Sequence, residues 1–212
     1  MQVRAVVVGH NFRFGHRAAG DIRLLAELGS RLGFETHVIN EVLLRHWAVS
    51  STAIRHAVRT GHVSKASRML GRFFALEGSV VSGQGIGSRQ TVPTLNLAAD
   101  SQLLPAHGVY ITQTTDLHDG RTWESITNVG IRPTFEGDQV TVETFLLSSF
   151  DGRTPARIRV EFLWRVRDER KFESAEVLKT QISKDVSRAK RYFRLREIRT
   201  TVRGWRDSEV ET

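Results

Sequence analysis

The sequence contains no cysteine and only four prolines in 212 residues. Without cysteine the chain can form neither a disulfide nor a thiolate metal site, and a reducing compartment is permitted. No apolar stretch approaches the ~20 residues that a membrane-spanning helix needs. No signal-peptide pattern opens the chain, because charge returns directly after a short apolar run. These absences predict a cytoplasmic protein with no membrane partner.

Several familiar site motifs are also missing. No G-K-S/T tripeptide follows a glycine loop, so a Walker loop is excluded, and no H-R-D or D-F-G triplet of the protein kinases occurs. The eight histidines show neither H-x-x-x-H nor H-E-x-x-H spacing, which argues against a zinc site. If the chain is an enzyme, its site is therefore neither a Walker loop, nor a protein-kinase site, nor a zinc site of these kinds.

The composition is that of a globular protein with a basic surface. Hydrophobic residues make up 40% and charged residues 25%, while the net charge is +8 and the pI is near 10.7. Such a charge suits a polyanionic ligand, whether nucleotide or nucleic acid, or simply a well-solvated basic surface. Lysine and arginine are interleaved with acidic residues, and no closely spaced strand aromatics are suited to stacking bases. We therefore expect no nucleic-acid partner; protein partners are left open.

The first 72 residues show the alternating strand and helix patterns of an α/β protein. Residues 3–8 form an apolar, β-branched run that predicts a strand buried on both faces, Asp21 is placed to cap a helix that ends at Gly33, and residues 36–39 predict the next strand. Residues 1–48 thus predict one β-α-β segment, which is only part of an α/β domain. Residues 49–72 predict two short helices as a connector.

From residue 73 the pattern changes to strands. Alternating or β-branched stretches at 78–82, 94–97, 108–117, 122–128, 139–147 and 157–166 are separated by turn residues and by no helix. They predict a six-stranded antiparallel β-barrel, so the chain is of mostly β, α+β type. Ser174 should cap a C-terminal helix whose stripe of Leu178, Ile182, Val186, Ala189 and Phe193 packs on the barrel. The barrel domain is expected to span 73–199, with a disordered tail at 200–212.

The most informative stretch is residues 83–96, G-Q-G-I-G-S-R-Q-T-V-P-T-L-N. Glycines at Gly83, Gly85 and Gly87 allow backbone N–H groups to turn toward a phosphate, although an ordinary β-turn uses the same residues. Thr94 and Asn96 are two apart, so in a strand their side chains share one face. A hydroxyl and an amide oxygen on one face are hard ligands suited to Mg²⁺ brought by a nucleotide.

Two further stretches carry candidate groups. Arg132, in N-V-G-I-R-P-T-F at 128–135 where a strand is expected to close in a turn, is either a phosphate ligand or half of a surface ion pair. Glu143 lies mid-strand on the face opposite Val142 and Thr144, where it is either solvated or aimed into a site as a general base. The charged run at 167–172 joins the last strand to the helix.

Taken together, G-Q-G-I-G…P-T-L-N, N-V-G-I-R-P-T-F, V-E-T-F-L-L and V-R-D-E-R-K-F-E-S…Q-I…D resemble the riboflavin kinase family, in particular the kinase module of the bacterial bifunctional riboflavin kinase/FAD synthetases. The resemblance covers about residues 73–195. It implies a Greek-key barrel that transfers the γ-phosphate of ATP to the 5′-hydroxyl of riboflavin, giving FMN. Riboflavin and ATP are then the small-molecule substrates, and Mg²⁺ is the cofactor.

The same resemblance assigns roles to individual residues. Thr94 and Asn96 match the motif that binds Mg²⁺ and the ATP phosphates, and Glu143 matches the catalytic base. The phosphate loop corresponds to Gly83, Gly85, Gly87 and Arg89. The flavin pocket corresponds to Leu146, Arg167, Arg170 and Phe172. Leu95 stands where the family usually has alanine, and Phe145 where it often has histidine, and neither change removes a ligand group.

Residues 1–55 resemble the later part of the nucleotidyltransferase domain of the same bifunctional enzymes. That domain opens with an H-x-G-H loop, and no H-x-G-H occurs in these 212 residues. The expectation is therefore an N-terminally truncated FAD synthetase domain and no FAD formation by this chain alone. Two alternatives remain open at this point: an enzyme that forms both FMN and FAD when complemented, and a non-enzymatic basic barrel that binds flavin or RNA.

Overall fold

The computed structural model describes residues 3–45, 47–81, 94–134, 137–148 and 153–208, with the side chains of 132–139 and of residues beyond 198 outside the description. The chain divides into two compact units, residues 1–50 and 51–212, which are considered separately. The elements of the first are β1 (Ala5–Gly9), the short helix η1 (His16–Ala18), α1 (Ile22–Leu32), β2 (Glu35–Ile39), β3 (Leu43–Leu44) and β4 (Trp47–Ala48).

The first unit contains the predicted β-α-β arrangement. β1 and β2 pair in parallel, and α1 connects them along the chain. Asp21 caps α1 by accepting from the backbone N–H groups of Arg23 and Leu24, both at 3.0 Å, and Gly33 ends it at φ 79°. The predicted two-sided burial of the first strand is wrong, because Val7 is 62% exposed and only Val8 is buried. In the described part of this unit, the parallel sheet has two strands and one α-helix beside it. One helix cannot cover both faces of a sheet, as parallel sheets normally require.

The second unit begins with two helices, α2 (Ser51–Arg59) and α3 (Val63–Leu70), which the sequence analysis treats as a connector. They pack on each other and on the barrel: Val58, Val63 and Ala66 are fully buried. The Ser64 hydroxyl donates to the carbonyl of Leu163 at 3.1 Å, which joins α3 to the last strand.

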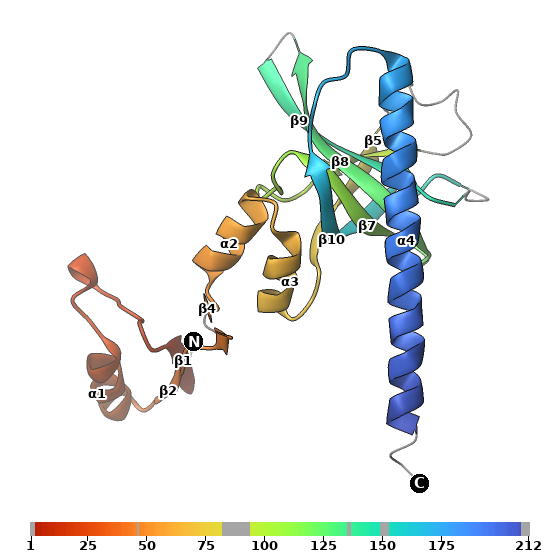
Figure 1. Ribbon diagram of the computed structural model, residues 1–212. Helices are drawn as coiled ribbons and strands as arrows, with labels where there is room; N and C mark the ends of the chain where they lie inside the picture. Colours follow the sequence, from red (N-terminus) through yellow and green to blue (C-terminus); the bar gives the residue numbers. More distant parts are fainter. Residues whose placement is uncertain (1–2, 46, 82–93, 135–136, 149–152, 209–212) are drawn as a thin grey trace. The chain divides into compact units, whose positions relative to one another are not determined.

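The barrel has six strands, as predicted: β5 (Phe74–Val81), β6 (Thr94–Ala99), β7 (Gly108–Asp116), β8 (Thr122–Thr134), β9 (Gly137–Leu146) and β10 (Arg157–Asp168). They close in the order β10-β5-β6-β9-β8-β7, and every pair is antiparallel (Figure 1). Three consecutive strands, β7 to β9, are joined in sequence, and β6 lies beside β9, which makes a Greek key.

Side chains alternate between the barrel interior and its outside. The interior is filled by Leu76, Tyr110, Phe162 and other apolar residues that have no exposed surface. It also holds a chain of buried hydroxyls in which Thr127 bonds Thr112 at 2.8 Å and Thr144 at 3.0 Å. Because each hydroxyl has a partner, these polar groups can be buried at little cost.

β8 is longer than the sequence predicts. We expect the strand to close at Asn128, whereas it continues through Arg132 and Pro133 to Thr134 and pairs with β9 over its whole second half. The β7 partner of β8 ends at Gly108, opposite Val129, so the strand beyond has a neighbour on one side only. Proline, which lacks an N–H group, is tolerated where one side of a strand needs no partner. A turn between β7 and β8 contains Gly120 at φ 76°, and the N–H of Gly120 donates to the carbonyl of Asp116 at 3.0 Å.

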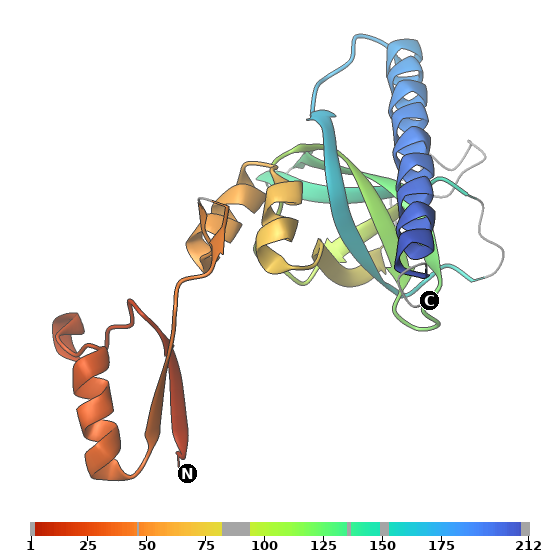
Figure 2. The same cartoon turned by 60° about the horizontal axis from the view of Figure 1, so that its bottom comes forward.

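The C-terminal helix α4 (Ala175–Ser208) lies along the outside of the barrel (Figure 2). Ser174 caps it by accepting from the N–H of Val177 at 3.3 Å. Ala189 and Phe193 are buried against strand residues that point outward, namely Val109, Ile111, Ile126 and Leu163. None of the described helices, α4 included, is long and apolar enough to cross a bilayer.

Two predictions for α4 are wrong. Leu178 and Ile182 belong to the predicted packing stripe, yet they are 39% and 41% exposed. The helix also extends through residues 200–208, where we expect no structure. Lengthening an existing helix avoids the unfavourable nucleation step, so a segment without an apolar stripe can continue it.

Candidate active site

A row of polar side chains crosses the outside of the barrel on three neighbouring strands. The register places Asn96 of β6 opposite Glu143 of β9, and Glu143 opposite Asn128 of β8. All three residues are partly buried, whereas Val142, Thr144 and Val129 beside them in the chain are buried in the barrel. Residues directly opposite on paired strands have Cβ atoms about 4.5–5.5 Å apart. An amide, a carboxylate and a second amide therefore stand side by side.

Thr94 and Asn96 lie on this same outer face, as the sequence predicts from their spacing. Leu95 and Leu97, on the other side of β6, are 3% and 6% exposed and fill the barrel. The Thr94 hydroxyl, the Asn96 amide oxygen and the Glu143 carboxylate are hard oxygen donors, which is the set that Mg²⁺ takes. No cluster of three His, Cys, Asp or Glu suited to a metal occurs among the described residues. Mg²⁺ commonly keeps several water or phosphate ligands beside one or two protein oxygens, which these donors fit.

Glu169 and Asn128 are further candidate site residues, to which the sequence pattern gives no role. Both side chains lie against Gly130 on the outside of β8: a Cβ placed there would collide with the Glu169 carboxylate and come within 3.0 Å of Asn128 Nδ2. Glu169 thereby brings a second carboxylate toward the strand pair that carries Glu143. The missing side chain at Gly130 was the only signal in the sequence, and a glycine within a strand often marks such a close approach.

The charged residues at the end of β10 and directly after it form a network with α4. Arg167 Nε donates to Asp185 Oδ2 at 2.9 Å, and Gln181 Nε2 donates to Asp185 Oδ1 at 2.8 Å. Arg170 donates to Gln181 Oε1 at 2.5 Å. Both arginines lie near the ring of Phe172, with guanidinium carbons 5.5 and 4.8 Å from its centroid. The predicted flavin residues Arg167, Arg170 and Phe172 are thus neighbours.

The remaining predicted site residues are Leu146, the glycine-rich segment and Arg132. The side chain of Leu146 has no exposed surface and points into the barrel, so it does not reach the face that carries Glu143. Gly83, Gly85, Gly87 and Arg89 lie outside the described residues, in the segment between β5 and β6. The backbone of Arg132 pairs with Gln139 in β9, and its side chain is outside the description.

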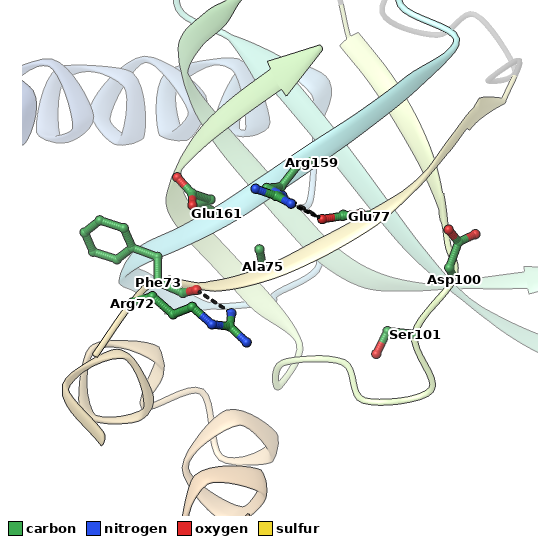
Figure 3. A pocket seen from close by; sticks show the side chains of 8 residues that line it. All are labelled: Arg72, Phe73, Ala75, Glu77, Asp100, Ser101, Arg159 and Glu161. Atoms are coloured by element: carbon green, nitrogen blue, oxygen red, sulfur yellow. Dashed lines mark hydrogen bonds and ion pairs between the residues drawn. The ribbon is translucent and has the colours of Figure 1, made fainter. Parts of the chain in front are cut away.

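A hollow of about 490 Å³ lies elsewhere, on the outside of β5 and β10 (Figure 3). Its charged groups include Arg159, which donates to Glu77 at 2.6 Å, and Asp100, which accepts from Arg157 at 2.5 Å. Exposed ion pairs of this kind contribute about 0–1 kcal/mol each. Among the residues that the structure describes, none of those predicted to bind ligand lines this hollow.

The fold and the polar row define a class: small closed antiparallel barrels with a row of oxygen donors beside a glycine-rich connection. Residues 70–193 match the riboflavin kinase family, and residues 1–53 match the FAD synthetase family. The first match covers more than half of the chain, and the chain belongs to the riboflavin kinase family.

Relatives extend this comparison. The bifunctional riboflavin kinase/FMN adenylyltransferase of Pseudomonas fluorescens is 35% identical over 189 residues, which is 89% of this chain and 60% of that protein. The protein of the same description from Haemophilus influenzae is 32% identical, over 91% of this chain and 62% of the relative. A crystal structure described as a macrolide-efflux protein from Streptococcus pneumoniae has a TM-score of 0.75 and 26% identity, over 86% of this chain and 58% of that one. The chain thus spans about three fifths of the length of these relatives.

Proposed function

We propose that the chain is a riboflavin kinase, which transfers the γ-phosphoryl group of ATP to the 5′-hydroxyl of riboflavin and forms FMN and ADP. One observation carries the proposal: Asn96, Glu143 and Asn128 form a continuous row on the outside of a barrel that belongs to this family. Thr94 adds a hydroxyl to the same face, at the end of the glycine-rich segment. Phosphoryl transfer needs a positioned hydroxyl, a nearby base and donors for the phosphates, and this row supplies the base and several of the donors.

Glu143 is the proposed general base. Its carboxylate accepts the proton of the ribityl 5′-hydroxyl while that oxygen forms a bond to the γ-phosphorus and the bond from phosphorus to the β,γ-bridging oxygen breaks. Asn96 and Asn128 lie directly opposite Glu143 on the two neighbouring strands. A base contributes about 10²–10⁴-fold to the rate of such a step.

Thr94 and Asn96 are the proposed ligands of Mg²⁺. The ion, when bound, neutralises charge on the phosphate oxygens of ATP. Both donors lie on one strand that is paired on each side, so the barrel fixes their separation before any ligand arrives. We propose phosphate contacts for Gly83, Gly85, Gly87 and Arg89, and for Arg132, on the basis of the family motif.

Residues near the end of β10 are proposed to bind the flavin. Arg170 and Phe172 present a cation and an aromatic ring. Arg170 is bound to Gln181 of α4, and Arg167, near the same ring, is bound to Asp185 of α4. Glu169 lies between this cluster and the polar row, beside Asn128. The flavin would thus be bound by residues 167–172 with its ribityl chain directed toward Glu143. Leu146 supports the row from inside the barrel.

A direct assay tests the proposal. The purified chain is incubated with riboflavin, ATP and Mg²⁺, and the flavins are separated chromatographically. We expect FMN, and we expect Glu143→Gln to lower kcat by about 100-fold or more, because it removes the base and keeps the shape. Glu161→Gln is the matched control, since Glu161 is an outward glutamate of β10 in the hollow of Figure 3. Absence of FMN, or equal rates for the two variants, would contradict the proposal.

The same chromatogram tests the expectation about FAD. These 212 residues contain no H-x-G-H loop, and we propose that they form FMN without FAD. FAD formed by the chain alone would overturn this part and leave the kinase proposal standing. RNA binding that depends on salt and that ATP does not displace, together with no FMN, would instead favour a non-enzymatic barrel.

A further inference from the structure

A second groove, of about 390 Å³, lies between α4 and the outside of β7 and β10. One wall is a stripe of α4: Arg188, Arg191, Tyr192 and Leu195 follow the spacing i, i+3, i+4, i+7, which places them on one side of a helix. The facing wall is formed by outward residues of the strands, Ile111, Trp164 and Val166. None of Thr94, Asn96 and Glu143 lines this groove, so it is separate from the proposed active site.

The groove combines an accessible aromatic surface with two cations. Trp164 is 51% exposed, which is unusual for so large an apolar side chain on a barrel with a filled interior. The ring of Tyr192 packs edge-on against the buried ring of Phe193, with centroids 5.6 Å apart. This contact fixes the position of Tyr192 in the groove wall. Arg188 and Arg191 are exposed and three residues apart, which puts them side by side on the helix.

These two arginines differ from those that serve the fold. Arg165 donates to the carbonyl of His107 at 2.7 Å, and Arg167 is bound to Asp185. Among the residues that the structure describes, the side chains of Arg188 and Arg191 form no ion pair and no hydrogen bond. An exposed indole can stack on a planar ring, and two neighbouring guanidinium groups can bind an anionic group attached to that ring.

We propose that this groove binds a planar heteroaromatic ring that carries a phosphate, with the ring against Trp164 and the phosphate on Arg188 and Arg191. The size of the groove favours a small molecule. Pockets for such ligands occupy about 300–1,000 Å³, and the stretch of α4 from Arg188 to Leu195 spans about 10 Å, close to the length of a fused ring system. A stable protein interface needs about 20–30 residues on each side, many more than the groove supplies.

Flavin nucleotides and adenine nucleotides share this chemistry, and the experiment separates them. The four tryptophans of the chain give four indole N–H signals in a ¹⁵N correlation spectrum, and Trp164→Phe identifies the signal of Trp164. FMN, ATP, riboflavin and inorganic phosphate are titrated separately, without turnover. We expect FMN or ATP to shift the Trp164 signal saturably. Riboflavin and inorganic phosphate should bind at least about tenfold more weakly, since each lacks one of the two recognised parts.

Charge variants locate the binding. Arg188→Ser with Arg191→Ser should weaken the effect on Trp164 by about tenfold or more, and Lys184→Ser with Arg194→Ser, two other exposed cations of α4, should leave it nearly unchanged. Formation of FMN should be the same in both double variants, so failure here is distinct from failure of the proposed function. A stronger response to FMN than to ATP assigns the groove to flavins, and the reverse assigns it to adenine nucleotides. No movement of Trp164, an equal response to riboflavin and FMN, or a response that survives loss of both arginines would overturn the proposal.

Discussion

The ion pair between Arg167 and Asp185 makes a quantitative prediction about stability. The Asp185 side chain is 3% exposed and the Arg167 side chain 17%, and Asp185 also accepts from Gln181. Asp185→Ala removes the carboxylate that pairs with the mostly buried guanidinium of Arg167. That guanidinium then keeps one of these acceptors, the carbonyl of Asp168 at 3.0 Å. Breaking a buried pair from one side costs about 3–5 kcal/mol. Because Arg167 keeps a carbonyl and some solvent, we expect the lower end, about 3 kcal/mol.

Urea unfolding followed by tryptophan fluorescence measures this change. With a slope of about 2–3 kcal/mol per molar, a loss of about 3 kcal/mol lowers the midpoint by about 1–1.5 M. The informative control is the double variant Arg167→Met with Asp185→Leu. Replacing both charges with apolar groups removes the unpaired charge, so the double variant should be more stable than Asp185→Ala. An Asp185→Ala variant within about 0.5 kcal/mol of the parent, or a double variant less stable than the single one, would refute the reasoning.

Three further predictions concern the barrel. Gly130→Ala should lower both stability and FMN formation through its collision with Glu169, and adding Glu169→Ala should restore most of the stability, measured by urea unfolding. Thr127→Val should cost about 1–3 kcal/mol, because it removes a hydroxyl shared by two buried neighbours, and it should leave the fold intact by circular dichroism. Burial raises the pKa of Tyr110 to about 12. Since the unfolded chain loses that proton first, stability should fall as the pH rises from about 10 to 12. Ultraviolet titration of the Tyr192→Phe variant, in which Tyr110 is the remaining tyrosine, checks the value; a pKa near 10 would contradict it.

The strands and the faces on which their side chains lie were predictable, because both rest on local alternation. Thr94 and Asn96 share a face for the same reason that Leu95 and Leu97 are buried, and the same alternation sets Glu143 apart from Val142. Membership in the row was harder to predict. Asn128 stands beside Glu143 because of the register between β8 and β9, which the pattern of a single strand does not contain.

Predictions that depend on tertiary contacts were less successful. The ion pair between Arg167 and Asp185 was not predicted, because Asp185 lies 18 residues further along the chain and local sequence does not show which residues meet in the fold. Leu178 and Ile182 continue the apolar period of α4, yet the barrel wall that covers Ala189 and Phe193 does not cover them. Periodicity identifies which side of a helix is apolar, and the extent of the surface opposite decides how much of that side is buried.

The pairing of β10 has a consequence for how the protein is made. This strand joins β5 on one side and β7 on the other, and it pairs Arg157 with Ser79, 78 positions earlier in the chain. During synthesis β5 to β9 leave the ribosome first, and both β5 and β7 then present open edges until β10 follows. Open edges are templates for pairing with other chains. Long-range pairing is also the slow step of folding in β proteins. The nascent chain is therefore most exposed to misassembly in the interval between the release of β9 and that of β10, and a folding factor that protects it would act there.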